Sequence, residues 1–396
     1  MLGTLSAVRL CGDRARNTWG HTTVVPDVTI SPAPATQVDV VVVGAGQAGL
    51  SAAYHLKRLG ASFVVLDANP APGGAWQHRW RTLTMRDVHG IAMLPGLDVP
   101  ARVEDEAARD FVPAYYAAYE ERFDLPVVRP VRVLRVEDAE SGNPDGDLVV
   151  HTDVGTWRAR AVINATGTWE RPFWPSYPGA SSFRGRQLHT ADYTGPGDVA
   201  GLDVVVVGGG ASAVQILGEV APRAASTTWV TRREPIWRVG EFDPDAGRDA
   251  VALVEERVRR GLPPQSVVSV TGLMLRPQEQ RAAAMGAYDR HPMFTRIEPD
   301  GVRMADGTFR HADVIVWATG FRAALGHLAP LHLREDTGGV RLVAREDAHT
   351  PTTAARDHRV QLVGYGPSAS TIGANRAGRV AALSALRVVA SRAAAA

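Results

Sequence analysis

Cysteine and lysine are the residues that this sequence has least of. Cys11 is the sole cysteine in 396 residues, so the chain can form no intrachain disulfide and no redox-active cysteine pair. Lys57 is the sole lysine, and arginine carries nearly all of the positive charge. Basic and acidic residues are mixed along the chain, and the formal net charge is only +1. The composition therefore argues against nucleic acid and membranes as partners.

Long apolar runs are also missing. No stretch approaches the ~20 apolar residues that are needed to span a bilayer. Residues 1–36 contain several arginines but no continuous apolar segment of the kind found in secretory signals. We interpret residues 1–36 as a disordered N-terminal extension, with an over-long gene start or a transit peptide as the alternatives. These features predict a cytoplasmic protein.

The order of apolar runs is repeated within the chain. Residues 38–43 form a buried-strand pattern, followed by a glycine-rich turn and a helical run. The same plan returns at residues 204–220. Each half later ends in a strand followed by Ala-Thr-Gly, at residues 165–167 and 318–320. Because 396 residues also exceed what one core usually supports, the repetition predicts an α/β protein with two Rossmann-like dinucleotide-binding domains.

The domain boundaries follow from where the plan repeats. The chain should leave the first domain near residue 170 and re-enter it near residue 320. The first domain would then comprise residues 37–170 and 320–396. The second domain would comprise residues 171–319 and would be inserted into the first.

The first glycine turn has the spacing of a dinucleotide-binding site. Gly44 permits the tight turn, Gly46 lets the backbone approach a pyrophosphate, and Gly49 lets the helix pack on the strand. The helix N-terminus would stabilise the phosphates. Asp67 lies 23 residues after Gly44 and would accept hydrogen bonds from an adenosine ribose. A purely structural turn is the alternative.

The second glycine turn differs at the position of the acid. The turn has Ala213 in place of the third glycine, and its expected nucleotide-binding residues are Gly208, Gly210, Ser212 and Ala213. Counting 23 residues from Gly208 leads to a threonine, and Arg232 and Arg233 follow it. Guanidinium groups can bind a 2′-phosphate, so we expect FAD at the first turn and NADPH at the second. A solvated arginine pair is the alternative.

Four further segments carry a resemblance to a known family. Residues 183–193 fit the pattern FxGxxxHxxx[YF], and residues 73–77 read Gly-Gly-Ala-Trp-Gln. The first Ala-Thr-Gly is followed by two prolines, and the second is followed by an aromatic residue, Phe321. In this order the segments resemble the flavin-containing monooxygenases, including the plant auxin-synthesis flavin monooxygenases and their bacterial relatives.

The resemblance implies an activity and assigns further residues. It implies an enzyme that uses FAD, NADPH and O₂, forms a flavin C4a-hydroperoxide, and oxygenates a small organic substrate at a nitrogen, sulfur or carbon nucleophile. Gln77 becomes the catalytic candidate, because its amide could hydrogen-bond an oxygenated flavin; a surface amide is the alternative. The remaining cofactor-binding candidates lie in the same segments and are Gly74, Trp76, Thr166, Gly167, Thr319 and Gly320. Phe183, Gly185, His189 and Tyr193 are interpreted as structural.

Other functions stay open. Disulfide reductases of similar plan need a cysteine pair and are excluded. Reductases that pass electrons to ferredoxin or a quinone need only FAD and NADPH. Baeyer–Villiger monooxygenases are closer relatives of the flavin-containing monooxygenases, although their identifying pattern has tryptophan at the position of Tyr193. A non-enzymatic redox sensor is a further alternative. No metal site is expected, and the oligomeric state is open, with a homodimer among the alternatives.

Overall fold

The computed structural model describes residues 35–88, 91–101, 103–238, 244–264, 273–275, 277–344 and 350–395. The interpretation of residues 1–36 as a disordered extension lies almost wholly outside these residues. Of the two that are described, Thr36 already belongs to the first strand.

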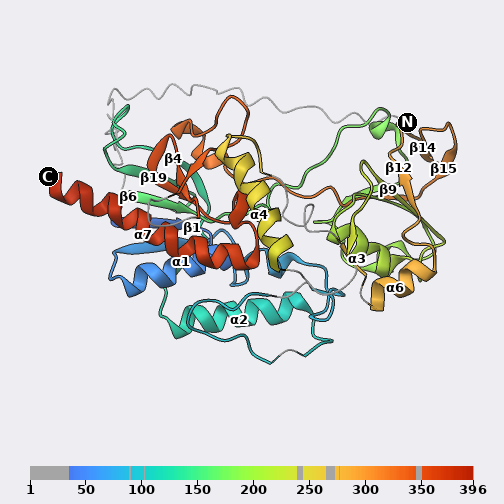
Figure 1. Cartoon of the computed structure of the whole chain (residues 1–396), viewed down its shortest axis with the longest axis horizontal. Coiled ribbons are helices and arrows are strands. Elements are labelled where there is room, and N and C mark those ends of the chain that lie inside the picture. Colours follow the sequence, from blue (N-terminus) through green and yellow to red (C-terminus); the bar gives the residue numbers. More distant parts are fainter. Residues whose placement is uncertain are drawn as a thin grey trace, which may run out of the picture. The chain divides into compact units, whose positions relative to one another are not determined.

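A large mixed sheet carries the first glycine turn (Figure 1). Strand β1 (Thr36–Val43) lies at its centre and pairs in parallel with β2 and β6. Val40, Val41 and Val42 are fully buried, as expected for a strand covered on both faces. In the described part of the chain, nine strands form the sheet; the other eight are β2 (Phe63–Leu66), β3 (Val127–Val128), β4 (Val133–Asp138), β5 (Leu148–Thr152), β6 (Thr156–Asn164), β17 (Leu342–Val343), β18 (Thr353–Ala354) and β19 (Asp357–Leu362).

Helices α1 (Gln47–Arg58) and α7 (Thr371–Ala395) lie side by side along this sheet (Figure 1). They approach closely because Gly378 of α7 has no side chain: a Cβ there would lie 2.5 Å from Ser51 Oγ. Ser51 Oγ also donates a hydrogen bond to the carbonyl oxygen of Asn375 at 3.0 Å. Helix α2 (Ala108–Arg122) packs against the short 3₁₀ helix η1 (Gly74–His78).

A second, wholly parallel sheet carries the second glycine turn. Its order is β12-β9-β8-β16-β7. Helices α3 (Ala211–Val220) and α6 (Pro277–Ala284) lie beside it. Helix α4 (Pro244–Arg259), which precedes α6 in the chain, instead packs against β17 of the first sheet, where Val258 is buried in the core (Figure 1). The five strands are β7 (Arg186–His189), β8 (Asp203–Val207), β9 (Ser226–Thr231), β12 (Arg290–Pro292) and β16 (Val314–Trp317).

Smaller elements complete the described chain. β10 (Trp237–Arg238) pairs with β11 (Leu273–Met274), and β13 (Arg296–Glu298), β14 (Gly301–Arg303) and β15 (Phe309–His311) form a meander. Asp306 and Gly307 lie in the turn between β14 and β15. The short 3₁₀ helices besides η1 are η2 (Ala180–Ser182), η3 (Pro196–Val199), η4 (Gly326–Leu331) and η5 (Gly366–Ser368).

The predicted fold class is confirmed, with two sheets each built on a strand–glycine turn–helix unit. The first sheet takes its strands from residues 36–164 and 342–362, and the second takes its strands from residues 186–317. The domain boundaries near residues 170 and 320 stay a prediction, since residues 35–396 form one compact unit. No helix of the described ranges is long and apolar enough to cross a membrane.

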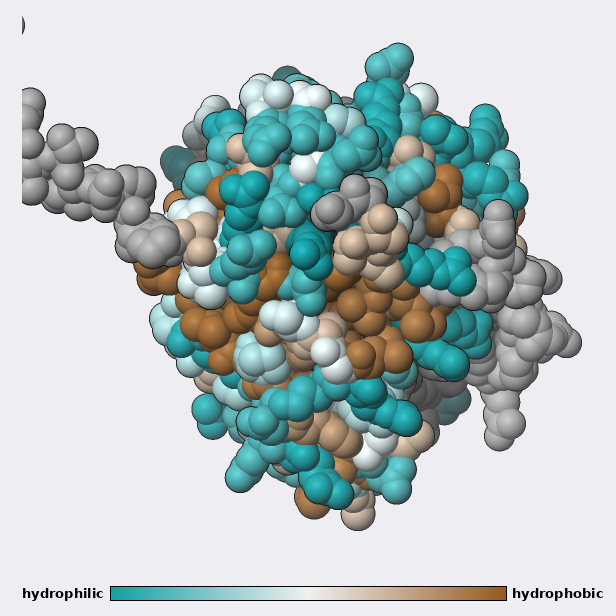
Figure 2. Space-filling view, turned by 90° about the vertical axis from the view of Figure 1, so that its left-hand side faces the viewer, coloured by the Kyte–Doolittle hydropathy of each residue, from teal (hydrophilic) through white to brown (hydrophobic). Residues whose placement is uncertain are grey.

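One face of the molecule carries exposed apolar residues. On the side that bears the C-terminal end of α7, hydrophobic residues gather in a band bordered by hydrophilic ones (Figure 2). Apolar surface of this kind is typical of interaction sites, although single exposed apolar residues are common. Homodimer formation stays a prediction.

Candidate active site at two glycine turns

Two glycines of the first turn serve the packing of the fold. At Gly44, which has a φ of +100°, an added Cβ would lie 2.7 Å from the carbonyl oxygen of Ala165. At Gly49, a Cβ would lie 1.8 Å from the carbonyl oxygen of Gly44. Both positions therefore exclude any side chain, because helix α1 lies against the turn and the turn lies against the end of β6.

Gly46 faces open space instead. A Cβ there would have one neighbour within 4 Å, the Cα atom of Gly74 at 3.9 Å. Gly46 is also the N-cap of α1, with no side chain capping the helix and no acid in its first turn. Free N–H groups and the positive end of the helix dipole thus face the space beside Gly46, as an anion-binding site requires. These features fit the pyrophosphate of a dinucleotide.

The Gly73-Gly74 segment brings η1 onto this turn. A Cβ on Gly74, whose φ is +52°, would lie 2.8 Å from the Cα of Gly46. At Gly73, which has a φ of +124°, an added Cβ would lie 2.6 Å from Pro113 Cγ of α2. The two glycines let the chain pass between α2 and the first turn. Trp76, two residues after Gly74, is partly buried against the core.

An arginine lies between two tryptophans next to η1. The guanidinium carbon of Arg79 is 4.8 Å from the ring centre of Trp169 and 5.7 Å from that of Trp76. Arg79 Nε is buried and has no hydrogen-bond partner among the described residues. Burial lowers the pKa of Arg79 to about 10. Trp169 in turn stacks on Phe321, with ring centres 4.9 Å apart, so aromatic contacts link η1 to the second Ala-Thr-Gly segment.

Gln77 is half-buried, and its amide nitrogen is already engaged. Nε2 donates to the carbonyl oxygens of Ala71 at 3.2 Å and Gly74 at 3.1 Å. The Gln77 side chain is thus bound to the backbone of the loop that precedes it, which includes the two glycines. Oε1 is the atom that remains to accept a hydrogen bond from a bound group.

Asp67 follows β2 directly and is buried. Its Oδ2 lies 3.4 Å from Arg129 Nη2, and its Oδ1 accepts a hydrogen bond from Asn69 Nδ2 at 3.0 Å. Arg129 is also paired with Glu120, at 2.5 Å. The structure therefore places Asp67 at the expected strand end, within a network that fixes the carboxylate.

The second glycine turn repeats the geometry of the first. A Cβ on Gly208, whose φ is +138°, would lie 2.2 Å from the carbonyl oxygen of Ala318. At Gly210, a Cβ would meet no heavy atom of the structure within 4 Å. Gly210 caps α3 without a side-chain hydrogen bond, Ser212 is half-buried in its first turn, and Ala213 is fully buried. This turn also fits a dinucleotide phosphate.

Arg232 and Arg233 are exposed and follow β9. The strand end lies beside the second glycine turn, since a Cβ on Gly209 would be 3.6 Å from Thr231 Cγ2. Neither arginine forms an ion pair with another residue of the described chain. Arg290 of β12, which is distant in sequence, lies against the same strand end and binds Thr231 and Glu234.

The two Ala-Thr-Gly segments hold the connections between the sheets. Thr166 Oγ1 donates to the carbonyl oxygen of Ala324 at 2.8 Å, and Thr319 Oγ1 donates to that of Phe173. Backbone hydrogen bonds join the same two segments, from Ala324 N to the Gly167 oxygen and from Phe173 N to the Gly320 oxygen. Both threonine side chains therefore bind backbone, and the two connecting segments run antiparallel beside each other.

His189 is a buried part of this connection. Its Nδ1 accepts a hydrogen bond from Ala191 N at 3.1 Å, so the proton lies on Nε2, which donates to the Gly320 oxygen at 3.0 Å. Burial lowers the pKa of His189, which favours the neutral ring. With both ring nitrogens bound to backbone, the geometry supports the structural interpretation of this histidine.

A carboxylate that sequence analysis did not single out lies between the two halves of the chain. Glu219 of α3 accepts hydrogen bonds from Trp80 Nε1 at 2.8 Å, Thr82 Oγ1 at 2.6 Å and the Tyr193 hydroxyl at 3.3 Å. Burial raises the pKa of Glu219. Tyr193, the last residue of the family pattern, thus helps to dock the 80–82 segment onto α3.

One group of potential metal ligands is present among the described residues. Asp203, His311 and Asp313 offer ligand atoms within 4.8 Å of one another. Asp313 Oδ2 accepts a hydrogen bond from Asp203 N, and Asp203 Oδ1 accepts one from Ser226 Oγ. The carboxylates thus already serve the strand ends at which they lie.

Arg79, Glu219 and Arg290 are the residues near the candidate site that sequence analysis missed. None lies in a glycine turn, and Glu219 and Arg290 meet their partners only through tertiary contacts. For Arg79, the one signal in the sequence was its position two residues after Gln77.

Known proteins resemble this chain in sequence and in structure. A family model described as pyridine nucleotide-disulphide oxidoreductase matches residues 41–262, which is more than half of the chain. The solved structure of a flavin-containing monooxygenase from Stenotrophomonas maltophilia is 39% identical, with a TM-score of 0.74, over 90% of this chain and 99% of that one. Cyclohexanone monooxygenase, at 19% identity and a TM-score of 0.62, shares the fold.

Two curated relatives match this chain over most of their own length. A ferredoxin–NADP reductase from Salinispora tropica is 31% identical over 76% of this chain and 79% of its own length. An indole-3-pyruvate monooxygenase from Oryza sativa subsp. japonica is 26% identical over 72% of this chain and 74% of its own length. The chain spans only about half the length of other curated oxidoreductases that it matches, at 51–59%.

The fold carries two strand–glycine turn–helix units of the kind that binds dinucleotides. The chain belongs to the pyridine nucleotide-disulphide oxidoreductase family and, within it, to the group of flavin-containing monooxygenases. The expected resemblance, the enzyme class, and FAD and NADPH as the cofactors of that group are confirmed. Despite the family's description, a cysteine-pair relay cannot operate within a chain that has one cysteine.

Proposed function

We propose that the chain is an FAD- and NADPH-dependent monooxygenase that oxygenates a small organic substrate at a soft nitrogen, sulfur or carbon nucleophile, with a flavin C4a-hydroperoxide as the oxygenating species. The observation that carries this proposal is the pair of uncapped helix N-termini, each beside a glycine whose missing side chain leaves open space, Gly46 and Gly210. The likeness to a flavin-containing monooxygenase over 99% of that chain supports it.

The residues divide into two nucleotide sites under this proposal. FAD would lie at the first turn, with its pyrophosphate at Gly46 and an adenosine ribose near Asp67. NADPH would lie at the second turn, with its pyrophosphate at Gly210 and a 2′-phosphate near Arg232 and Arg233. When bound, the flavin accepts hydride from the nicotinamide and activates O₂.

The protein's own contribution is to hold the flavin in place and to limit water. Gly73 and Gly74 place η1 over the first turn. Arg79 lies over the rings of Trp76 and Trp169 beside this segment, and these planar groups would limit the access of water from one side. Gln77 fixes the glycine segment and leaves Oε1 to accept a hydrogen bond from the oxygenated cofactor.

An ¹⁸O₂ experiment tests the proposal. The holoenzyme is supplied with NADPH and ¹⁸O₂ together with a thioether, a tertiary amine, a cyclic ketone or an aryl 2-oxo acid. Mass spectrometry then measures label in the product. We expect one ¹⁸O atom in the product of at least one of these classes, and an ester from the ketone would indicate Baeyer–Villiger chemistry. NADPH consumption that yields only H₂O₂ with every substrate class would argue against a monooxygenase.

A reductase is the second candidate, because the relative from Salinispora tropica is a ferredoxin–NADP reductase. Such an enzyme would reduce ferredoxin or a quinone rapidly without O₂. Anaerobic NADPH oxidation with ferredoxin, compared with aerobic oxidation without it, separates the two candidates. Faster anaerobic turnover would favour the reductase.

A further inference from the structure

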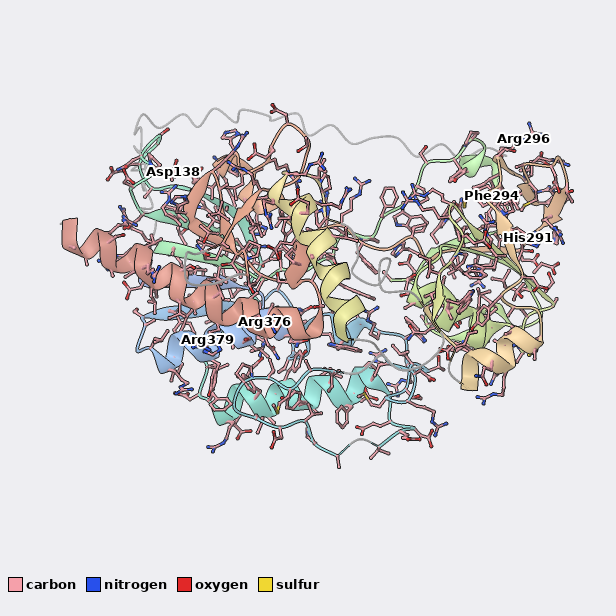
Figure 3. The ribbon with its side chains drawn as sticks, in the orientation of Figure 1. Asp138, His291, Phe294, Arg296, Arg376 and Arg379 are labelled. Atoms are coloured by element: carbon pink, nitrogen blue, oxygen red, sulfur yellow. The ribbon has the colours of Figure 1, made fainter. Side chains whose placement is uncertain are left out.

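Arg290 connects strand β12 to the turn that follows β9. β12 pairs in parallel with β9, with Arg290 opposite Trp229 and Pro292 opposite Thr231. His291, which Figure 3 labels, is the middle residue of this strand. This pairing brings Arg290 to a strand end that precedes it by 59 residues.

Each nitrogen of the Arg290 guanidinium has a partner on this turn. Nε donates to Thr231 Oγ1 at 2.9 Å, and Nη2 donates to the Thr231 carbonyl oxygen at 3.3 Å. Nη1 pairs with Glu234 Oε2 at 3.1 Å. The arginine side chain is 21% exposed, whereas that of Glu234 is 81% exposed. The largely buried guanidinium thus contacts both Thr231 at the start of the turn and Glu234 at its end.

Thr231 passes this restraint on to the following residues. Its hydroxyl accepts from Arg290 and donates to the carbonyl oxygen of Arg233 at 2.6 Å. The backbone from which Arg232 and Arg233 project is therefore closed by a hydrogen-bond chain that begins at Arg290. Pairing with Arg290 also compensates the charge of Glu234, which would otherwise repel a phosphate beside the turn.

We propose that Arg290 is a positioning residue that determines selectivity for the 2′-phosphate of NADPH. It fixes the Thr231–Glu234 turn so that Arg232 and Arg233 are preorganised for the phosphate, and it neutralises the one acid of that turn. The inference rests on the proposed preference for NADPH. It predicts that selectivity depends on a residue outside the segment where the nucleotide pattern lies.

The test measures binding of 2′,5′-ADP and 5′-AMP by calorimetry, because these two probes differ only in the 2′-phosphate. In Arg290→Gln, we expect 2′,5′-ADP to bind about tenfold more weakly, which is the loss of one charge-assisted contact. Binding of 5′-AMP should stay unchanged. Thr231→Val, which keeps the shape of this buried side chain but removes the hydroxyl, should weaken 2′,5′-ADP selectively in the same way.

Two further variants serve as controls. Arg296→Gln removes one positive charge from β13 without touching the turn, because Arg296 (Figure 3) pairs with Glu298. It should leave both probes unaffected. Glu234→Gln removes the acid and should bind 2′,5′-ADP as tightly as the parent or more tightly.

The outcomes separate the inference from its basis. If the parent protein binds both probes equally, the proposed NADPH preference fails, and the inference fails with it. If the parent discriminates but Arg290→Gln binds both probes like the parent, or weakens both equally, the role of Arg290 is refuted while the NADPH site stands. If Arg290→Gln loses selectivity but Thr231→Val keeps it, positioning through Thr231 is refuted. A variant of Arg290 that does not fold leaves Thr231→Val to decide.

Discussion

Alanine substitutions at Gly46 and Gly49 should distinguish the space that a nucleotide occupies from the space that the fold occupies. Gly46 has extended backbone with a φ of −79°, and a Cβ there would meet only the Cα of Gly74, at 3.9 Å. Gly49 lies one helical turn away, yet its Cβ would stand 1.8 Å from the carbonyl oxygen of Gly44. The same chemical change thus meets opposite surroundings.

The magnitudes follow from these surroundings. Gly46→Ala should leave the flavin-free protein within about 1 kcal/mol of the parent, because the restriction of the unfolded chain by alanine is offset by its poorer capping of α1. Gly49→Ala must push α1 away from the turn and should destabilise the protein by about 1–3 kcal/mol or more. In the Gly46 variant, the loss of one charge-assisted contact to the pyrophosphate should weaken FAD by about ten- to hundredfold.

Two measurements check these values. Circular dichroism during heating gives the Tm of the flavin-free proteins, and flavin fluorescence gives the Kd for FAD. Gly155→Ala is the matched control, because a Cβ on Gly155 meets no atom within 4 Å and the residue lies in a hairpin of the same sheet. A folded Gly46→Val protein that retains one FAD per chain would refute the assignment of the first turn. A Gly49→Ala protein as stable as the parent would refute the packing argument.

Three further predictions concern nucleotide choice, oxygen and pH. Arg232→Ala/Arg233→Ala should raise the KM for NADPH by about ten- to hundredfold per lost contact and leave NADH unchanged; equal losses for both nucleotides in steady-state kinetics would make the pair structural. Gln77→Ala should leave flavin reduction by NADPH nearly unchanged but release more H₂O₂ and shorten the life of an oxygenated flavin in stopped-flow spectra; an unchanged lifetime would remove Gln77 from the chemistry. Because burial raises the pKa of Glu219, its stabilising contribution is complete at low pH and is lost as pH rises through that raised value. The Tm of the parent minus that of Glu219→Gln should therefore fall as pH rises above the ordinary range of a glutamate, and a constant difference would contradict the raised pKa.

Glycine positions were predictable because close approach of backbones allows no other residue. The expectation that Gly44 makes a tight turn and that Gly49 packs helix on strand agrees with distances that exclude a Cβ. The strand and helix starts were predicted well for the same local reason. The predicted strand 38–43 lies within β1, and the unit expected from residue 204 begins one residue earlier, with β8.

Side-chain roles were less predictable because they depend on partners far along the chain. Thr166 and Thr319 lie where the family pattern predicts, but their hydroxyls bind the backbone of the two connecting segments. The amide nitrogen of Gln77 binds its own loop. Sequence position could not show whether these groups face a cofactor or the chain itself, so their cofactor-binding and catalytic roles stay predictions.

The sequence by itself determined the fold class, the two glycine turns and the exclusion of cysteine-pair chemistry, because each depends on residue type and short spacing alone. Only the tertiary structure decided which side chains meet across the sheets. Arg290 reaches Thr231 because β12 pairs with β9, and Glu219 joins Trp80 to Tyr193 because α3 lies against the 80–82 segment. Such contacts join residues whose separation in sequence is set by the lengths of intervening helices and loops. No local pattern records them, and strand pairing and helix packing alone bring them together.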